Sequence, residues 1–189
     1  PSPEEVARQT PPVPPVPAGG PRPFWSVMIP TYDCAHYLRR ALTSVLAQDP
    51  GPAEMQIEVI DDCSTADDPA AVIAEVGQGR VGFHRNARNL GATETFNVCL
   101  ARARGHWVHI LHGDDFVLDG YYADVRRTLT THPDLTMVVG RVVTVDAADR
   151  WMALIGPDAA HGGGRFATFA RQQAVTQLAQ FAGVLARRD

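Results

Sequence analysis

The stretch HWVHILHGDDFVLDG, residues 106–120, places two adjacent carboxylates, Asp114 and Asp115, at the abrupt end of a predicted buried strand. The apolar residues of HWVHIL predict that strand, and apolar residues return directly after the acidic pair. Carboxylates at strand ends are usually solvated, but hard oxygen ligands beside a glycine also suit Mg²⁺ or Mn²⁺. These residues alone are consistent with two interpretations, a solvated turn and a metal site.

The bulk properties are those of an ordinary globular protein. The chain has 189 residues, of which 45% are hydrophobic and 20% charged. A net charge of -4 lacks the basic footprint of nucleic-acid binding. No apolar run reaches the roughly 18 residues of a membrane span, and the N-terminus does not resemble a signal peptide. The three cysteines lack a metal-ligand spacing. We therefore expect a cytoplasmic protein, at most peripheral to a membrane, without a nucleic-acid partner.

The two ends of the chain differ from its middle. Residues 1–23 hold nine of the 15 prolines, which predicts a proline-rich disordered arm before a domain over residues 24–189. Docking of this arm as a proline-rich ligand is an alternative. The chain stops at GVLARRD, so we expect it to be part of a longer protein, incomplete on its acceptor side.

Strand-like and helical segments alternate after the arm. Strands are predicted at FWSVMI, QIEVI, RVGFH, HWVHIL and TMVVGRVVTV. Helices are predicted over residues 38–46, AAVIAEV, TETFNVCLARA, YYADVRRTL and RFATFARQQAVTQLAQF, with a glycine-rich loop before the last. Asp33, Asp68 and Asp119 are predicted helix caps. This order predicts an α/β fold whose mostly parallel sheet carries helices on both faces.

Ligands of such sheets bind outside the carboxyl ends of the strands, and polar residues follow each predicted strand here. Asp61 and Asp62 follow the second strand, where a carboxylate can accept hydrogen bonds from a ribose or a base. Thr31 and Tyr32 follow the first strand and offer a hydroxyl and a ring for stacking. Capped loops and solvated carboxylates would explain each motif singly, whereas two acidic pairs on one edge favour a nucleotide site.

Four motifs resemble the family 2 glycosyltransferases: SVMIPTYDCAHYLRRALTSVLAQ, IEVIDDCST, NLGATETFNVCLARARGHWVHILHGDD and VVGRVVTVD. The resemblance covers roughly Ser26 to Asp146. It implies the GT-A fold, a Rossmann-like sheet that binds nucleotide-diphosphate sugars. The implied reaction transfers a sugar, in the first instance from a UDP-sugar, to an acceptor hydroxyl with inversion.

The resemblance also implies a role for individual positions. The family's Asp-x-Asp-Asp (DXD) metal motif falls on residues 112–115, so Asp114 and Asp115 are expected to bind Mn²⁺ or Mg²⁺. His112 replaces the first aspartate of that motif, and Phe96 replaces an arginine often found before Asn97. The positions implied to bind the nucleotide are Pro30, Thr31, Tyr32, Asp61, Asp62, Asn89, Gly91, Asn97 and Asp114.

The family's catalytic base lies C-terminal to an FRR-like segment that VLARRD resembles. We therefore expect the base beyond Asp189, and no residue of this sequence is named for it. Two alternatives remain open. One is a catalytically silent module that binds nucleotide sugars or recruits partners through the arm. The other is a sugar nucleotidyltransferase, although PTYDCAH is neither glycine-rich nor basic.

Overall fold

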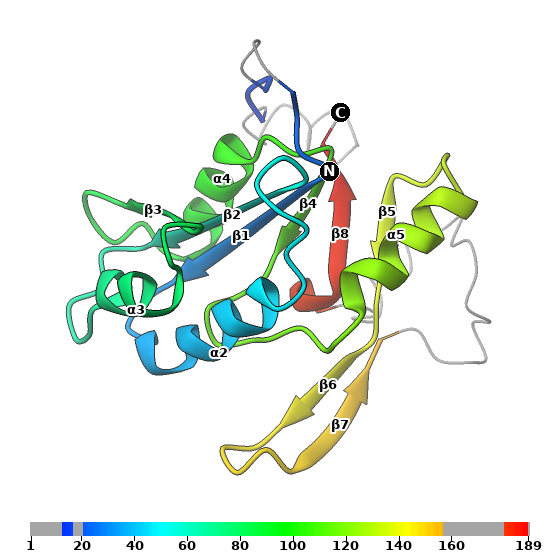
Figure 1. The fold of residues 1–189 in the computed structure, drawn as a ribbon. Coiled ribbons are helices and arrows are strands. Elements are labelled where there is room, and N and C mark those ends of the chain that lie inside the picture. Colours follow the sequence, from blue (N-terminus) through cyan, green and yellow to red (C-terminus); the bar gives the residue numbers. More distant parts are fainter. Residues whose placement is uncertain (1–12, 17–20, 157–179, 189) are drawn as a thin grey trace, which may run out of the picture.

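The computed structural model describes residues 13–16, 21–156 and 180–188. Within them, six strands form one sheet in the order β3-β2-β1-β4-β8-β5 (Figure 1). The first four are parallel neighbours, and β8 runs antiparallel to both β4 and β5. The expected α/β fold with a mostly parallel sheet is thereby confirmed. The strands of this sheet are β1 Trp25–Thr31, β2 Met55–Asp61, β3 Gly82–Arg85, β4 Trp107–Ile110, β5 Met137–Val139 and β8 Val184–Arg187.

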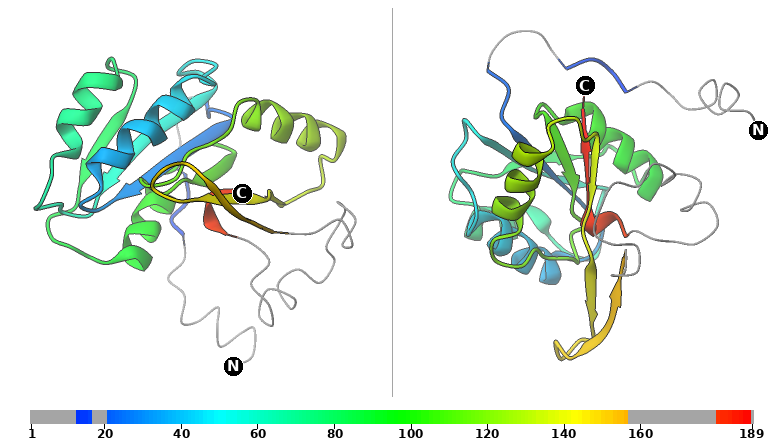
Figure 2. Two further views of the ribbon diagram at one scale, coloured as in Figure 1. Left: turned by 90° about the horizontal axis from the view of Figure 1, so that it is seen from below. Right: turned by 90° about the vertical axis from the view of Figure 1, so that its right-hand side faces the viewer.

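Helices cover both faces of the sheet. Three of them lie on one face and α4 lies on the other (Figure 2). Parallel strands must be joined by crossover connections that run over a face of the sheet. The helix in each of these connections therefore covers part of one face. The helices are α2 Ala35–Leu46, α3 Pro69–Val76, α4 Ala92–Arg102 and α5 Tyr121–Thr131.

The central strand β1 is buried along its whole length. Its side chains alternate between the faces: Val27 and Ile29 join the larger core under α2, while Met28 packs with Cys99 of α4. Burial on both faces explains why FWSVMI reads as a continuous apolar run rather than an alternating one. The strand therefore delivers its C-terminal residues rigidly to the carboxyl edge of the sheet.

Of the three predicted helix caps, Asp68 is confirmed and Asp119 is wrong. The Asp68 side chain accepts a hydrogen bond from Ala71 N and precedes a proline at the start of α3. At α5 the N-cap is Gly120, with a left-handed φ of 81° and no capping side chain. The left-handed conformation favours glycine, so the cap lies at Gly120 and not at Asp119, while the helix begins at Tyr121 as predicted.

The prediction for Asp33 is also wrong, because its carboxylate does not cap α2. It accepts hydrogen bonds from Thr65 N and Ala66 N, at 2.8 and 2.9 Å, which lower the pKa of Asp33. Ala35 N, in the first turn of α2, donates instead to Asp67 Oδ2 at 2.6 Å. The loops after β1 and β2 thus stabilise each other through their carboxylates.

The predicted strand TMVVGRVVTV divides at Gly140 into β5 and the separate strand β6, Val142–Val145. Gly140 N donates to Gly183 O at 2.7 Å, and a Cβ on Gly183 would lie 2.7 Å from Gly140 O. This close backbone approach directs β6 away from the main sheet. It pairs with β7, Trp151–Ile155, in a hairpin that projects beyond the sheet (Figures 1 and 2).

Parts of the proline-rich arm contact the domain. Arg22 donates to the carbonyls of Arg104 and Gly105, at 2.9 and 2.8 Å, and Arg188 donates to Pro14 O at 2.9 Å. The predicted glycine-rich loop and most of the last predicted helix fall on residues 157–179, outside the described ranges. None of the helices in the described ranges has the length and hydropathy of a membrane span.

Candidate functional site

A cavity of about 460 Å³ opens at the carboxyl edge of the sheet. Its walls come from the loops after β1, β2 and β4 and from the first turns of α4, which are segments far apart in the sequence. Parallel strands bring their carboxyl ends to one edge, so the topology gathers these loops. The lining residues are Pro30, Thr31, Tyr32, Cys34, Asp62, Asn89, Gly91, Ala92, Thr95, Phe96, His112, Gly113 and Asp114.

The first wall of the cavity is the end of β1. Thr31 is buried, and its Oγ1 lies 3.0 Å from Cys34 Sγ in a hydrogen bond. Tyr32 follows with 48% of its surface exposed, unusually high for a ring of its size. A tyrosine held at a cavity mouth presents an open face on which a planar group can stack.

Asp62 forms the second wall and is fixed by donors from the loop before α4. Its carboxylate accepts hydrogen bonds from Asn86 Nδ2, Leu90 N and Gly91 N, at 2.9, 2.8 and 2.9 Å. Burial by itself raises the pKa of this carboxyl, but the hydrogen bonds outweigh burial and hold its pKa below the ordinary value. Asp62 is therefore ionised and rigid at neutral pH.

Asp61, the residue beside it, is absent from the cavity lining. It is fully buried, and its Oδ1 accepts hydrogen bonds from Ser64 N and Ser64 Oγ, at 2.9 and 2.6 Å. Its Oδ2 lies 3.2 Å from Arg85 Nη1. Asp61 therefore holds the loop after β2 in shape, and the pleat of the strand explains why only one of two neighbouring carboxylates faces the cavity.

The segment before α4 contributes Asn89 and Gly91 to the cavity but not Asn97. Asn89 Oδ1 accepts a hydrogen bond from Gly91 N at 3.1 Å, and Gly91 takes a left-handed φ of 82° at the N-cap of α4. Asn97 Nδ2 donates to Glu94 at 3.4 Å along the helix. The structure thus brings seven of the ten predicted site residues to this cavity and leaves Asp61, Asn97 and Asp115 outside its lining.

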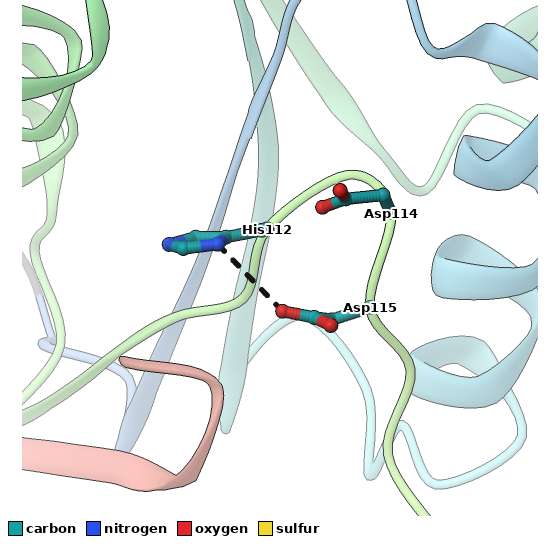
Figure 3. Close-up of side chains that lie close together, drawn as sticks. All are labelled: His112, Asp114 and Asp115. Atoms are coloured by element: carbon teal, nitrogen blue, oxygen red, sulfur yellow. Dashed lines mark ion pairs between the residues drawn. The ribbon is translucent and has the colours of Figure 1, made fainter. Parts of the chain in front are cut away.

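The loop after β4 brings His112, Asp114 and Asp115 together (Figure 3). Their potential ligand atoms all lie within 4.8 Å of one another, and His112 Nδ1 is 3.6 Å from Asp115 Oδ2. Burial, and then the neighbouring charge of Asp114, raises the pKa of Asp115. One imidazole nitrogen and two carboxylates form a donor set that fits a divalent cation.

Gly113 lets this loop lie directly against the end of β1. Gly113 N donates to Pro30 O at 2.9 Å. A Cβ at position 113 would come within 2.9 Å of Thr31 Oγ1 and 3.1 Å of Cys34 Sγ. Any larger residue would therefore force the Thr31 or Cys34 side chain, or the loop, to shift, and the glycine keeps the acidic loop close to the first wall of the cavity.

A second cavity, of about 270 Å³, adjoins the first across Asp114, which lines both. Its lining includes Asp115, Tyr121, Gly183 and residues 141–145. Arg40 connects two of its walls, because its guanidinium lies 3.6 Å from the Phe116 ring centroid and pairs with Asp149 in the β6–β7 turn. The acidic loop thus separates two adjoining spaces.

Sequence reasoning missed several residues of the first cavity. Cys34 lies two residues after Tyr32, Ala92 directly follows Gly91, and Thr95 lies one helical turn after Gly91. Neither apolar runs nor helical periodicity indicate that these three residues face a cavity. The resemblance treats His112 as a replaced aspartate, although its place beside two carboxylates indicates that it can bind a metal. Phe96 replaces an arginine of the family pattern, and it lies in the cavity wall.

Comparison with known proteins gives the context of this site. The model of glycosyl transferase family 2 matches residues 26–188. An uncharacterized protein of Mycobacterium tuberculosis is 38% identical over 106 residues, which are 56% of this chain and 32% of that protein. The poly(ribitol-phosphate) beta-N-acetylglucosaminyltransferase TarS of Staphylococcus aureus is 30% identical over 57% of this chain and 19% of its own length. The chain spans about a third or less of these relatives.

Solved structures share the fold. Residues 1–349 of TarS superimpose with a TM-score of 0.62 at 20% identity, covering 87% of this chain and 47% of that one. The same fragment has been solved with UDP-GlcNAc and with UDP. The mannosyltransferase PcManGT from Pyrobaculum calidifontis, solved with GDP-Man and Mn²⁺, gives a TM-score of 0.55 at 21% identity over 68% of this chain and 37% of that one.

Proposed function

The chain belongs to glycosyl transferase family 2, and on that premise we propose that it transfers a sugar from a nucleotide-diphosphate sugar to an acceptor hydroxyl. The proposed transfer proceeds with inversion and with a divalent cation, Mn²⁺ or Mg²⁺. One observation carries the proposal: carboxylates that follow two different strands, Asp62 and Asp114, line a single cavity whose rim carries the acidic loop. This arrangement suits a ligand with a polar nucleoside at one end and a diphosphate at the other.

The nucleoside occupies the half of the cavity between β1 and α4 in this proposal. Tyr32 offers its exposed ring to the base, and Pro30 and Thr31 form the floor beside it. Asp62, ionised and fixed, accepts hydrogen bonds from base or ribose donors. Asn89 and Gly91 line the same half. Asp61 supports the loop after β2, and Asn97 contacts Glu94 within α4, so neither lines the cavity.

The diphosphate lies toward the acidic loop, with Asp114 and Asp115 as the proposed cation ligands. When bound, a divalent cation neutralises the charge that develops on the departing diphosphate. Gly113 holds the acidic loop against β1, and Asp114 lines both cavities. These two residues therefore set the position at which the diphosphate would lie. The sugar then lies at the boundary between the two cavities.

The acceptor enters the second cavity in this proposal. An inverting transfer needs a base that removes the proton of the attacking hydroxyl. Among the described residues that line the second cavity, the carboxylates are Asp114 and Asp115, both assigned to the cation. We therefore assign no base among the described residues that line this cavity.

The ligands of the neighbours support this choice of donor. The TarS fragment was solved with UDP-GlcNAc and UDP, and PcManGT with GDP-Man and Mn²⁺. UDP-GlcNAc and GDP-Man are nucleotide-diphosphate sugars, and UDP is the product of transfer from a UDP-sugar. Asp62 and Asp114 are placed to bind the nucleoside and the diphosphate of such a ligand. A UDP-sugar is the proposed donor in the first instance.

Calorimetric titration with UDP, GDP and dTDP, with and without Mn²⁺, tests the proposal. We expect one nucleoside diphosphate to bind with micromolar affinity and more tightly with the metal than without it, and Asp114→Asn to abolish the metal effect. A glycosyl-donor hydrolysis assay then separates an enzyme from a silent binding module. If no nucleotide binds under any of these conditions, the proposal is wrong.

A further inference from the structure

The rings of His112 and Phe96 stack on each other. Their centroids are 5.3 Å apart and their planes are inclined by 15°. Phe181 completes an aromatic group around them, with its centroid 5.3 Å from Phe96 and 6.2 Å from His112. His112 and Phe96 are also the two positions at which the sequence departs from its family pattern. The structure shows that these two departures are in direct contact.

This stack joins the two departures in space. An aspartate at position 112 would add a third carboxylate beside Asp114 and Asp115, where like charges repel one another. An imidazole adds no negative charge there and packs on the Phe96 ring. His112 and Phe96 therefore form a stacked pair beside the two carboxylates.

The imidazole of His112 is oriented with one nitrogen toward the carboxylates. Nδ1 of His112 points toward Asp115 Oδ2 at 3.6 Å, beyond hydrogen-bond distance (Figure 3). Nε2 is buried and has no hydrogen-bond partner among the described residues. An imidazole lone pair and two carboxylates that converge within 4.8 Å repel one another unless a proton or a cation lies between them. A cation with three protein ligands would remove this repulsion.

We propose that His112 is the third protein ligand of the cation held by Asp114 and Asp115, and that it selects a transition-metal ion such as Mn²⁺ or Co²⁺ over Mg²⁺. This inference rests on the proposed function and specifies its metal. Mg²⁺ prefers oxygen ligands and retains its waters, whereas an imidazole nitrogen strengthens the binding of first-row transition-metal ions, of Co²⁺ more than of Mn²⁺. Phe96 is a positioning residue, because it holds the imidazole plane without contacting the cation.

Electron paramagnetic resonance of bound Mn²⁺ tests the inference directly on the whole chain. Wild-type protein is labelled with ¹⁵N only in its histidines, loaded with Mn²⁺ with and without UDP, and compared with unlabelled protein by pulsed measurements. We expect a nitrogen coupling to the metal that changes from the ¹⁴N to the ¹⁵N pattern on labelling. This measurement needs no variant, so it does not depend on whether a substitution folds.

Variants then assign the coupling and measure the selectivity. In His112→Ala we expect the nitrogen coupling to disappear and the Mn²⁺ affinity to fall by about 10–100-fold, while Mg²⁺ affinity, measured by competition, changes much less. Phe96→Leu should keep the coupling and weaken Mn²⁺ binding by a smaller factor. The double substitution His112→Asp with Phe96→Arg should raise Mg²⁺ affinity relative to Mn²⁺. His132→Ala, at the C-cap of α5, is the matched control, and it should leave the nitrogen coupling and both metal affinities unchanged.

Two results overturn the inference. One is bound Mn²⁺ without any histidine coupling in the wild type, and the other is undiminished Mn²⁺ affinity in His112→Ala. In both cases calorimetric binding of a nucleoside diphosphate would still leave the proposed function in place. Absence of both metal and nucleotide binding would remove the two proposals together.

Discussion

Asp62 and Asp114 line the same cavity from opposite sides of β1, because β2 and β4 are the two neighbours of that strand in the sheet. The first carboxylate is ionised and held by three hydrogen bonds, whereas the second is exposed and lies beside His112 and Asp115. One end of the cavity is thus a fixed hydrogen-bond acceptor and the other an exposed candidate cation site.

Replacing Asp62 by asparagine should weaken both nucleotide binding and the fold. The amide offers one acceptor oxygen and no charge to three donors, so we expect a loss of unfolding free energy of about 1–3 kcal/mol and at least about a tenfold weaker nucleotide affinity. Urea denaturation and calorimetry measure the two effects.

The matched control is Asp61→Asn, one residue earlier. Asp61 is also buried and accepts two hydrogen bonds from Ser64, but it does not line the cavity. It should lose stability by a similar amount while the nucleotide affinity of the folded protein stays near the wild-type value. Equal losses of nucleotide affinity in the two variants would contradict the prediction that Asp62, but not Asp61, contacts the nucleotide.

A methyl group at position 113 should separate the acidic loop from β1. In Gly113→Ala the new Cβ would meet Thr31 Oγ1 at 2.9 Å, so one of the two loops must shift by several tenths of an ångström. We expect metal-dependent nucleotide binding to weaken while the core stays folded, as measured by calorimetry and circular dichroism. Gly82→Ala, on the edge strand β3, is the control, since its new Cβ would meet the Glu58 side chain at 3.2 Å and neither residue lines the cavity. Unchanged nucleotide binding in Gly113→Ala would contradict the assigned role of this loop.

Bound nucleotide should protect Cys34 from alkylation. Cys34 is half-buried and lines the cavity, so a ligand there limits the access of iodoacetamide to its thiol. Labelling at pH 8, followed by mass spectrometry of the peptides, should show slower modification of Cys34 in the presence of UDP and Mn²⁺.

The other two cysteines are internal controls for this experiment. Cys63 is also half-buried but lies outside the cavity lining, and its labelling rate should not respond to nucleotide. Cys99 is buried in the core, and burial raises the pKa of its thiol to about 12, so it should stay unlabelled in the native protein. Protection of Cys63 but not of Cys34 would place the ligand elsewhere.

Acid should destabilise the protein through His109. Burial lowers the pKa of this imidazole to about 4, against about 6.5 in an unfolded chain. Its Nε2 donates to Ala182 O and its Nδ1 accepts from Tyr122, both at 3.0 Å, so the neutral ring is fully satisfied. Between pH 6.5 and 4 the unfolded chain binds a proton that the native protein does not. The unfolding free energy should therefore decrease as the pH is lowered from 6.5 to 4, by on the order of 3 kcal/mol.

The variant His109→Gln isolates this effect, because it keeps a polar group but cannot titrate. The unfolding free energy of the wild type minus that of the variant should decrease from pH 7 to pH 4 and level off below. The neighbouring Tyr121 and Tyr122 have pKa values raised by burial and stay protonated throughout. Parallel stability curves for the two proteins would refute the assignment.

The residues at the carboxyl edge of the sheet could be predicted because the signals for them lie within short stretches of the sequence. Apolar runs set the positions of β1, β2 and β4, and the polar residues that follow them must meet at one edge of a parallel sheet. Pro30, Tyr32, Asp62 and Asp114 were found in this way. Which of two adjacent residues faces the cavity depends on the pleat and on the loop, so Asp61 and Asp62 were not separable from the sequence.

The other half of the sheet was not predictable by the same means. Strand β8 inserts antiparallel between β4 and β5, a pairing between segments far apart in the sequence. The break at Gly140 exists because Gly183 approaches it, and no local signal shows that contact. Likewise, His112 and Phe96 were each noted as departures from a pattern, but only the fold shows that one packs on the other.

A crystal structure of the protein soaked with UDP and Mn²⁺, with anomalous data collected for manganese, tests the central claim most directly. We predict density for the nucleoside between Tyr32 and Asp62, and an anomalous peak within coordination distance of Asp114, Asp115 and His112. A nucleotide bound outside this cavity, or manganese bound away from the loop after β4, would contradict the account.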